Sequence, residues 1–141
     1  MEYVRKGGVI ALRLVKGEEI VASLTTVAAR ESVSAACVSG IGAVGRATIG
    51  VLRTSDKRYV KRELEEDMEI ASLTGNISVG ADGKPYLHLH VVLGGIENVY
   101  AGHLNEAYVS ATAEIFITLF EAGIGRFYDD ETGLNLMKFE D

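Results

Sequence analysis

Apolar and polar residues alternate along most of this chain, and a period of two is typical of half-buried β-strands. The alternation predicts strands separated by turn-forming residues, over residues 8–17, 32–40, 45–54, 59–64, 68–80, 86–93 and 99–104. The tail, residues 125–141, is expected to form two short strands around an Asp-Glu-Thr-Gly turn. Short connections between so many strands predict a largely antiparallel sheet.

Residues 18–31 break this alternation and predict the main helix. Helical spacing would place four apolar side chains on one face, namely Ile20, Leu24, Val27 and Ala28. Glu18 and Glu19 lie at the end of the segment that carries the positive helix dipole, and Arg30 lies at the opposite end. One helix packed with a sheet of many strands predicts an α+β domain.

Residues 107–123 fit a helix or a strand, but their β-branched and aromatic content favours a strand. One face of that strand would carry Ala111, Ala113, Ile115, Ile117 and Leu119. The other face would carry Thr112, Glu114, Phe116 and Thr118.

The chain has 141 residues, the usual length of one domain, and is expected to form a single domain over residues 1–141. With 48% hydrophobic residues it can fill a core, which excludes a disordered chain. No apolar run reaches the roughly 18 residues of a transmembrane helix, and the first residues lack the layout of a signal peptide. We expect a cytoplasmic protein that does not contact membranes.

A net charge of −6 argues against a general nucleic-acid-binding surface, because such a surface needs basic residues to replace the counterions of the phosphates. Basic residues concentrate in residues 53–62, but an acidic segment, residues 63–69, follows at once. This pattern is typical of a solvent-exposed strand and turn of mixed charge.

Gly40, Gly42 and Gly45 have the spacing of a dinucleotide-binding motif, but the residues that follow have a strand pattern. Such a motif requires a helix at this point, whose N-terminus would contact the pyrophosphate. The glycines are instead expected to form a tight turn close to a neighbouring strand. Cys37 lies in the apolar run before them and is expected to be a small buried residue.

All three histidines fall within residues 88–103. In a strand over residues 86–93, His88 and His90 share one face, and a turn at residues 94–98 would return the chain so that His103 lies opposite one of them. Three neutral imidazoles suit Zn²⁺ or a similar divalent ion and leave a coordination position open. Paired histidines also occur in strands without a metal, so spacing alone leaves both interpretations open.

Three further residues are candidates for the surroundings of this site. Glu69 and Glu114 lie in otherwise apolar segments, where a carboxylate could complete a metal site or act as a general base. Arg46, just after the glycine-rich segment, could bind an anion. Each of the three is also compatible with an ordinary solvent-facing side chain.

Several segments together resemble the plant- and prokaryote-conserved (PPC) domain family, also called DUF296. They are the glycine-rich SGIGAVG, the strand LHLHVVLG, the AGHL that contains His103, and ATAEIFI. The resemblance spans residues 9–139 and implies an antiparallel sheet with one helix, assembled as a homotrimer. The fold is also similar to that of acetolactate decarboxylases, which hold a catalytic zinc with an H-x-H pair and a later histidine. This similarity implies that His88, His90 and His103 bind a metal.

The sequence also supports trimerisation, since the apolar faces of residues 107–120 exceed what one small domain needs to cover. Plant members of the family bind DNA through an AT-hook outside the domain, and no R-G-R-P hook occurs here. Three functions stay open. The chain could be a trimeric protein that binds a divalent metal ion, preferably zinc, and uses this ion to bind a small ligand. It could be a metal-dependent hydrolase or decarboxylase, or a DNA-associated regulator, which the net charge disfavours.

Overall fold

The computed structural model describes residues 1–140, with side chains to residue 139, and has nine strands and one helix in this range. In chain order they are β1 (Glu2–Lys6), β2 (Val9–Val15), α1 (Ile20–Arg30), β3 (Ala36–Arg53), β4 (Arg58–Leu64), β5 (Met68–Val79), β6 (Pro85–Gly94), β7 (Val99–Leu119), β8 (Gly123–Asp129) and β9 (Leu134–Glu140). The predicted α+β class is confirmed, because one short helix accompanies a largely antiparallel sheet.

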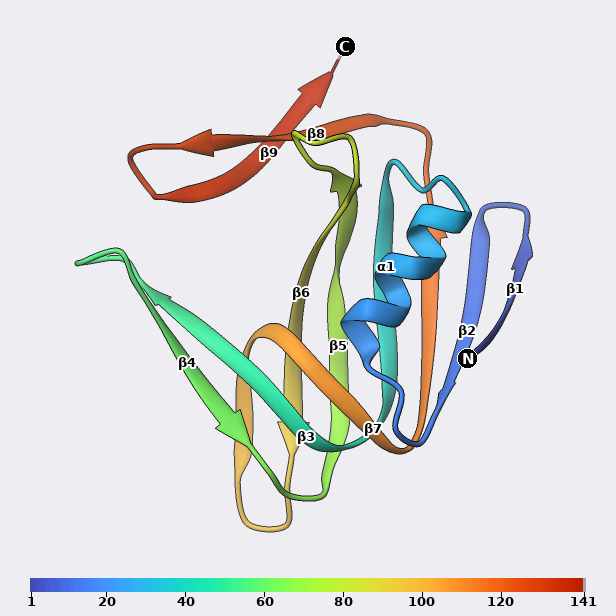
Figure 1. The fold of residues 1–141 in the computed structure, drawn as a ribbon, viewed down its shortest axis with the longest axis vertical. Coiled ribbons are helices and arrows are strands. Elements are labelled where there is room, and N and C mark those ends of the chain that lie inside the picture. Colours follow the sequence, from blue (N-terminus) through green and yellow to red (C-terminus); the bar gives the residue numbers. More distant parts are fainter. Residues whose placement is uncertain (141) are drawn as a thin grey trace.

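Strands β1 to β7 form one sheet in the order β1-β2-β7-β6-β5-β3-β4, and β7 also pairs with β3. The pairings therefore run from β3 through β5, β6 and β7 back to β3, so this part of the sheet closes on itself. Strands β8 and β9 form a separate two-stranded sheet. Figure 1 shows α1 against one face of the large sheet and the β8–β9 hairpin across one end of it.

Helix α1 buries the four predicted apolar residues against the sheet. It begins at Ile20 because Glu19 is its N-cap residue, whose carboxylate accepts a hydrogen bond from the Val21 N–H at 3.0 Å. The same carboxylate oxygen accepts a hydrogen bond from the Ala107 N–H of β7 at 2.9 Å. One acidic side chain thus caps the helix and attaches it to β7.

Strand β3 runs without a break through the glycine-rich segment, so the predicted tight turn at residues 40–45 is wrong. The chain instead shifts its register between Gly40 and Gly42, as in a β-bulge. A Cβ atom at Gly42 would lie 2.4 Å from the Thr112 carbonyl oxygen of β7, so the predicted close approach of a neighbouring strand is confirmed. Strand β3 continues after Gly45 to Arg53, where the dinucleotide-binding geometry would need a helix, so that geometry is excluded.

The expectation of a buried Cys37 is also wrong, because Cys37 is exposed in this chain. Its neighbours Ala36 and Val38 fill the core positions of β3, so alternation turns Cys37 to the opposite face of the sheet.

Residues 107–119 form the second half of β7, so the predicted strand is confirmed as far as Leu119. Ala113, Ile115 and Ile117 are buried, whereas Ala111 and the opposite face, with Glu114 and Phe116, are exposed. The strand is long enough to pair with β6, β3 and β2 along its length.

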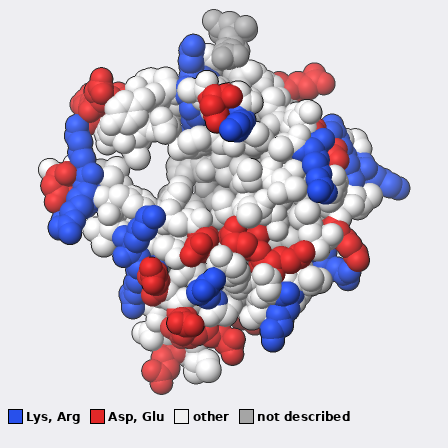
Figure 2. All heavy atoms as spheres, in the orientation of Figure 1, with Lys and Arg blue, Asp and Glu red and all other residues white. Residues whose placement is uncertain are grey.

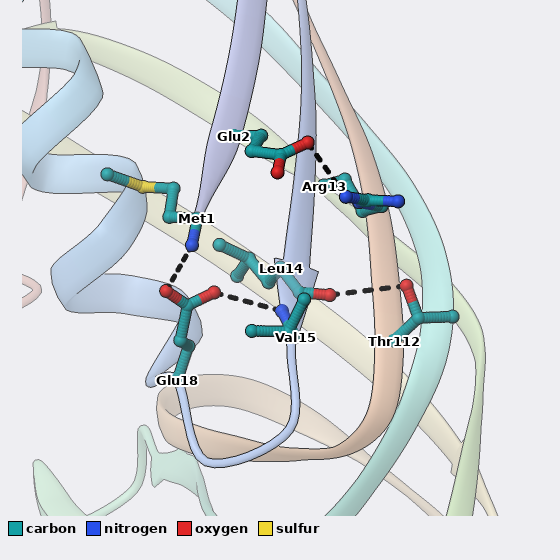
Figure 3. Close-up of polar contacts among 7 residues, drawn as sticks. All are labelled: Met1, Glu2, Arg13, Leu14, Val15, Glu18 and Thr112. Carbon is teal, nitrogen blue, oxygen red and sulfur yellow. Dashed lines mark hydrogen bonds and ion pairs between the residues drawn. The ribbon is translucent and has the colours of Figure 1, made fainter.

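Strand β2, which lies between β1 and β7, is fixed by side chains as well as by the backbone ladder (Figure 3). Thr112 of β7 donates a hydrogen bond to the Leu14 carbonyl oxygen at 3.2 Å, and Glu18 accepts one from the Val15 N–H at 2.9 Å. Glu18 also accepts a hydrogen bond from the amino group of Met1. These contacts hold the turn between β2 and α1.

Across the described part of the chain, no helix is both long and apolar enough to cross a lipid bilayer.

Candidate metal centre

The register of two neighbouring strands brings the three histidines together. In β6, Leu89 and Val91 face the core, so His88 and His90 share the opposite face. The turn between Gly94 and Val99 then returns the chain, and His103 of β7 pairs directly with His90. The sequence allows either His88 or His90 to pair with His103, and in the structure the partner is His90.

The three imidazole rings form a compact triangle. The centroid distances are 5.1 Å between His88 and His90, 5.2 Å between His88 and His103, and 5.7 Å between His90 and His103. One ring nitrogen from each residue lies within 4.8 Å of the other two. A single ion can therefore reach all three residues with small rotations of the side chains.

Two glycines allow the backbone to approach this triangle. A Cβ atom at Gly102 would lie 2.8 Å from the Gly50 carbonyl oxygen, and Gly50 pairs directly with His103. A Cβ atom at Gly50 would in turn lie 2.1 Å from the Tyr59 hydroxyl oxygen. Because Gly50 has no Cβ, the Tyr59 hydroxyl group can occupy this place and donate a hydrogen bond to the Asn105 side-chain oxygen at 2.9 Å. Larger residues at either glycine would push His103 or Tyr59 from its place.

The histidines lie in a cavity of about 540 Å³, which we call the histidine pocket. Its other walls come from the ends of β3 and β4 and from the β8–β9 hairpin. In Figure 2 the hollow opens at the upper left, between the projecting end of β3 and β4 and the body of the molecule. Among the side chains that the structure describes, no Asp or Glu lines this pocket.

Burial shifts His88 and His103 toward the form that binds a metal. Desolvation lowers the pKa of His88, and the neighbouring His103, His90 and Arg126 lower it further. Desolvation, followed by the charge of His90, also lowers the pKa of His103. Both imidazoles are therefore held neutral, and a neutral imidazole is the species that donates its lone pair to a metal.

Arg126 of β8 is the residue of this pocket that sequence reasoning missed. Its guanidinium donates hydrogen bonds to the Ser78 hydroxyl at 2.8 Å, the Asn76 side-chain oxygen at 2.6 Å and the Asn135 carbonyl oxygen at 3.2 Å. It also stacks over the Tyr86 ring, with its central carbon 4.7 Å from the ring centroid. The sequence does contain one indication that Arg126 is buried. It lies two residues after the apolar Ile124 and therefore on the same face of a short strand.

The structure does not bring the three other candidate residues to the histidines. Glu69 and Glu114 line a different cavity of about 500 Å³, between β3, β5 and β7. Arg46 is exposed and stacks on Tyr108, with its central carbon 4.1 Å from the ring centroid. The histidine pocket therefore has no carboxylate base from this chain among the described side chains.

A family model for the plants and prokaryotes conserved domain matches residues 1–121. The chain belongs to this PPC family. The match includes all strands that carry the histidines and ends before the β8–β9 hairpin. The predicted resemblance is confirmed. No functionally curated protein matches this PPC protein at a significant level.

Several solved structures are similar to this PPC protein over nearly its whole length. A Bacteroides thetaiotaomicron protein, described as a "putative dna binding protein", has a TM-score of 0.94 at 30% identity and covers 99% of this chain and 98% of its own. A metal-containing protein from Archaeoglobus fulgidus has a TM-score of 0.86 at 38% identity, with 99% and 97% covered. A PPC protein from Pyrococcus horikoshii has a TM-score of 0.84 at 33% identity, with 99% and 94% covered.

The predicted similarity in fold to acetolactate decarboxylases is confirmed at a greater distance. A Staphylococcus aureus protein of unknown function, described as similar to alpha-acetolactate decarboxylase, has a TM-score of 0.57 at 16% identity. The match covers 79% of this PPC protein and 52% of the other chain. At this identity the likeness concerns the fold alone.

Proposed function

We propose that this PPC protein binds a divalent metal ion through His88, His90 and His103 and presents it to a small ligand. The observation that carries the proposal is the convergence of one nitrogen from each histidine within 4.8 Å. Strand register and a glycine turn enforce this convergence, because His90 pairs directly with His103 across the turn that follows Gly94.

The donor set supports zinc as the ion. Three imidazole nitrogens, with no carboxylate or thiolate among the described residues of the pocket, are typical of zinc rather than of magnesium or calcium, which prefer oxygen ligands. A zinc ion with three protein ligands keeps an open coordination position that can bind and polarise a ligand or a water molecule. The similar protein from Archaeoglobus fulgidus, at 38% identity, is described as metal-containing, which supports the binding of a metal ion at this fold.

We infer further that the protein works as a homotrimer. Ile41 and Phe116 are large apolar side chains with 59% and 50% of their surfaces exposed, and both lie beside Glu114 on the sheet face that also presents Cys37. Apolar surface of this kind on a small domain favours contact with another copy of the chain. A monomer in light scattering at micromolar concentration would contradict this inference.

Elemental analysis of untagged protein tests the metal proposal. We expect about one zinc ion per chain after loading and removal of excess metal, since one histidine cluster exists per chain. The His88→Ala/His90→Ala variant is expected to retain none. Thr74→Ala is the matched control, because Thr74 pairs with His90 on the neighbouring strand but does not line the pocket. Equal zinc in the double variant and the control would refute the site.

A metal-dependent hydrolase or decarboxylase is the second candidate, favoured by the open coordination position. Such an enzyme needs a group that moves protons, and the carboxylates we considered, Glu69 and Glu114, line another cavity. Tyr59 carries a hydroxyl group that could move a proton, and its ring lies 6.2 Å from that of His103. Turnover of test esters that depends on zinc and is lost in Tyr59→Phe would support an enzyme.

A DNA-associated regulator is the third candidate, favoured by the description of the similar Bacteroides thetaiotaomicron protein. The basic residues of segment 53–62, at the end of β3 and in β4, are exposed, but an acidic segment follows them at once and Arg53 forms an ion pair with Asp56 at 2.9 Å. Together with a net charge of −6 this surface disfavours phosphate binding. DNA binding that weakens steeply with added salt in a mobility-shift assay would revive this candidate.

A further inference from the structure

A buried, positively charged side chain lines the histidine pocket without an acidic partner. Arg126 is only 9% exposed, and no carboxylate pairs with it among the described side chains. Its hydrogen bonds go to neutral acceptors on Ser78, Asn76 and Asn135. A guanidinium has five N–H donors, and these three bonds do not use all of them. The remaining N–H groups are available to bind a ligand in the pocket.

Burying an unpaired charge is costly, and proteins normally place a carboxylate beside it. This chain has 20 acidic residues against 14 basic ones, yet no described acidic side chain reaches the pocket. The pocket therefore holds one fixed positive charge, to which a bound divalent metal would add two more. Charge complementarity favours an anion as the occupant, since an anion would supply the missing partner.

The rest of the pocket indicates what the anion is attached to. Much of the remaining wall is apolar and comes from Val51 and Leu52 of β3 and from Leu134, Leu136 and Met137 of β9. A cavity of about 540 Å³ is large enough for a small organic molecule and larger than an inorganic ion requires.

We propose that the histidine pocket binds a small organic oxyanion, whose carboxylate or phosphate group lies between Arg126 and the three histidines and whose apolar body contacts the β8–β9 hairpin. The proposal deepens the metal-binding function and rests on it for the second contact of the anion. Arg126 acts as the anion-binding residue and the histidines as the metal ligands, so the two roles can be separated by experiment.

The test is calorimetric titration of the untagged protein, zinc-loaded and metal-free, with acetate, pentanoate and inorganic phosphate. Arg126→Met is the test variant. Arg46→Met is the matched control, because it removes the same charge outside the pocket. We expect Arg126→Met to weaken anion binding about ten-fold or more, as for loss of a charged hydrogen bond, and Arg46→Met to leave it unchanged.

Pentanoate is expected to bind more tightly than acetate, because its chain covers apolar wall. A higher affinity for pentanoate than for phosphate would identify a carboxylic acid as the source of the oxyanion, and the reverse order a phosphate ester. No anion binding at all, or equal weakening in both arginine variants, would overturn the proposal. Equal binding of acetate and pentanoate would overturn the placement of the apolar body.

Two further controls keep these outcomes distinct. Zinc content is measured for every sample, so a protein without zinc refutes the metal site, while the metal-free titration still reports on Arg126. Arg126 also attaches the hairpin, so Arg126→Met could unfold it. In that case Arg126→Gln, which removes the charge but keeps hydrogen-bond donors for the hairpin contacts, is compared with Arg46→Gln, and equal anion affinities in these two variants and the unmodified protein would overturn the proposal.

Discussion

Two hollows of similar size lie on this sheet and have opposite chemistry. The histidine pocket, about 540 Å³, contains three imidazoles and a guanidinium and no described carboxylate. The second, about 500 Å³, contains Glu69 and Glu114 and no histidine or arginine, and we call it the carboxylate hollow. Strands β3 and β7 contribute to both, so one strand pair separates nitrogen donors at one end from oxygen donors at the other.

This separation would allow the proposed metal site and the proposed contact surface to share strands without interfering. The carboxylate hollow adjoins the exposed Ile41 and Phe116, on the face that we propose to meet other copies of the chain. The histidine pocket instead lies behind the β8–β9 hairpin. If the two hollows are functionally independent, changes in one should leave the other intact.

The largest expected contrast is in stabilisation by zinc. A metal at about 100 times its Kd stabilises the folded state by about 2.7 kcal/mol, which corresponds to roughly 5–10 °C in Tm for a chain of this size. We expect this shift in thermal unfolding of the unmodified protein and of Glu69→Gln and Glu114→Gln. His103→Gln should show almost none. A lost shift in either glutamate variant would show that the carboxylate hollow contributes to metal binding.

A smaller contrast in zinc affinity is expected when one glycine beside each hollow is replaced by alanine. In Gly102→Ala the new Cβ would lie 2.8 Å from the Gly50 carbonyl oxygen, and in Gly42→Ala 2.4 Å from that of Thr112. Each change should lower the free energy of unfolding by about 1–3 kcal/mol in denaturant titrations. Only Gly102→Ala should also weaken zinc binding, because it displaces the strand that carries His103. Normal zinc affinity in that variant would contradict this view of the site.

The smallest expected effect is on pH dependence without metal. Since burial lowers the pKa of His88 and His103, the unfolded chain binds more protons than the folded one once the pH falls below the ordinary histidine value of about 6.5. The Tm of chelator-treated protein should therefore fall between pH 7.5 and 5, and fall less in His88→Gln/His103→Gln. Parallel pH profiles would indicate that the folded state does not depress these pKa values.

The sequence predicted those features that depend on local alternation. His88 and His90 share a face because strands alternate, and the short turn after Gly94 left few registers for His103. Arg126 could not be predicted, because its role depends on how a separate hairpin packs onto the ends of β5 and β6. The positions of Glu69 and Glu114 also escaped prediction, since the bulge at Gly42 changes which side chains meet across β3 and β7.

The same reasoning explains the two errors in β3. Glycines suggested a turn, but the close approach of β7 explains them equally well, and only the three-dimensional pairing distinguishes the two cases. Cys37 lies in an apolar run, and such a run does not reveal which of its residues face the core. Both errors concern contacts between distant segments.

The β8–β9 hairpin forms a sheet of its own. It is attached by hydrogen bonds from Arg126 to Asn76 and Ser78 and from Lys57 to the Asp130 carbonyl oxygen. A wall attached by so few contacts should be replaceable. Another hairpin grafted after residue 121 would present different side chains to the pocket, while β6 and β7 kept their histidines. The proposed ligand contacts and the proposed metal ligands would therefore be open to change in separate parts of the chain.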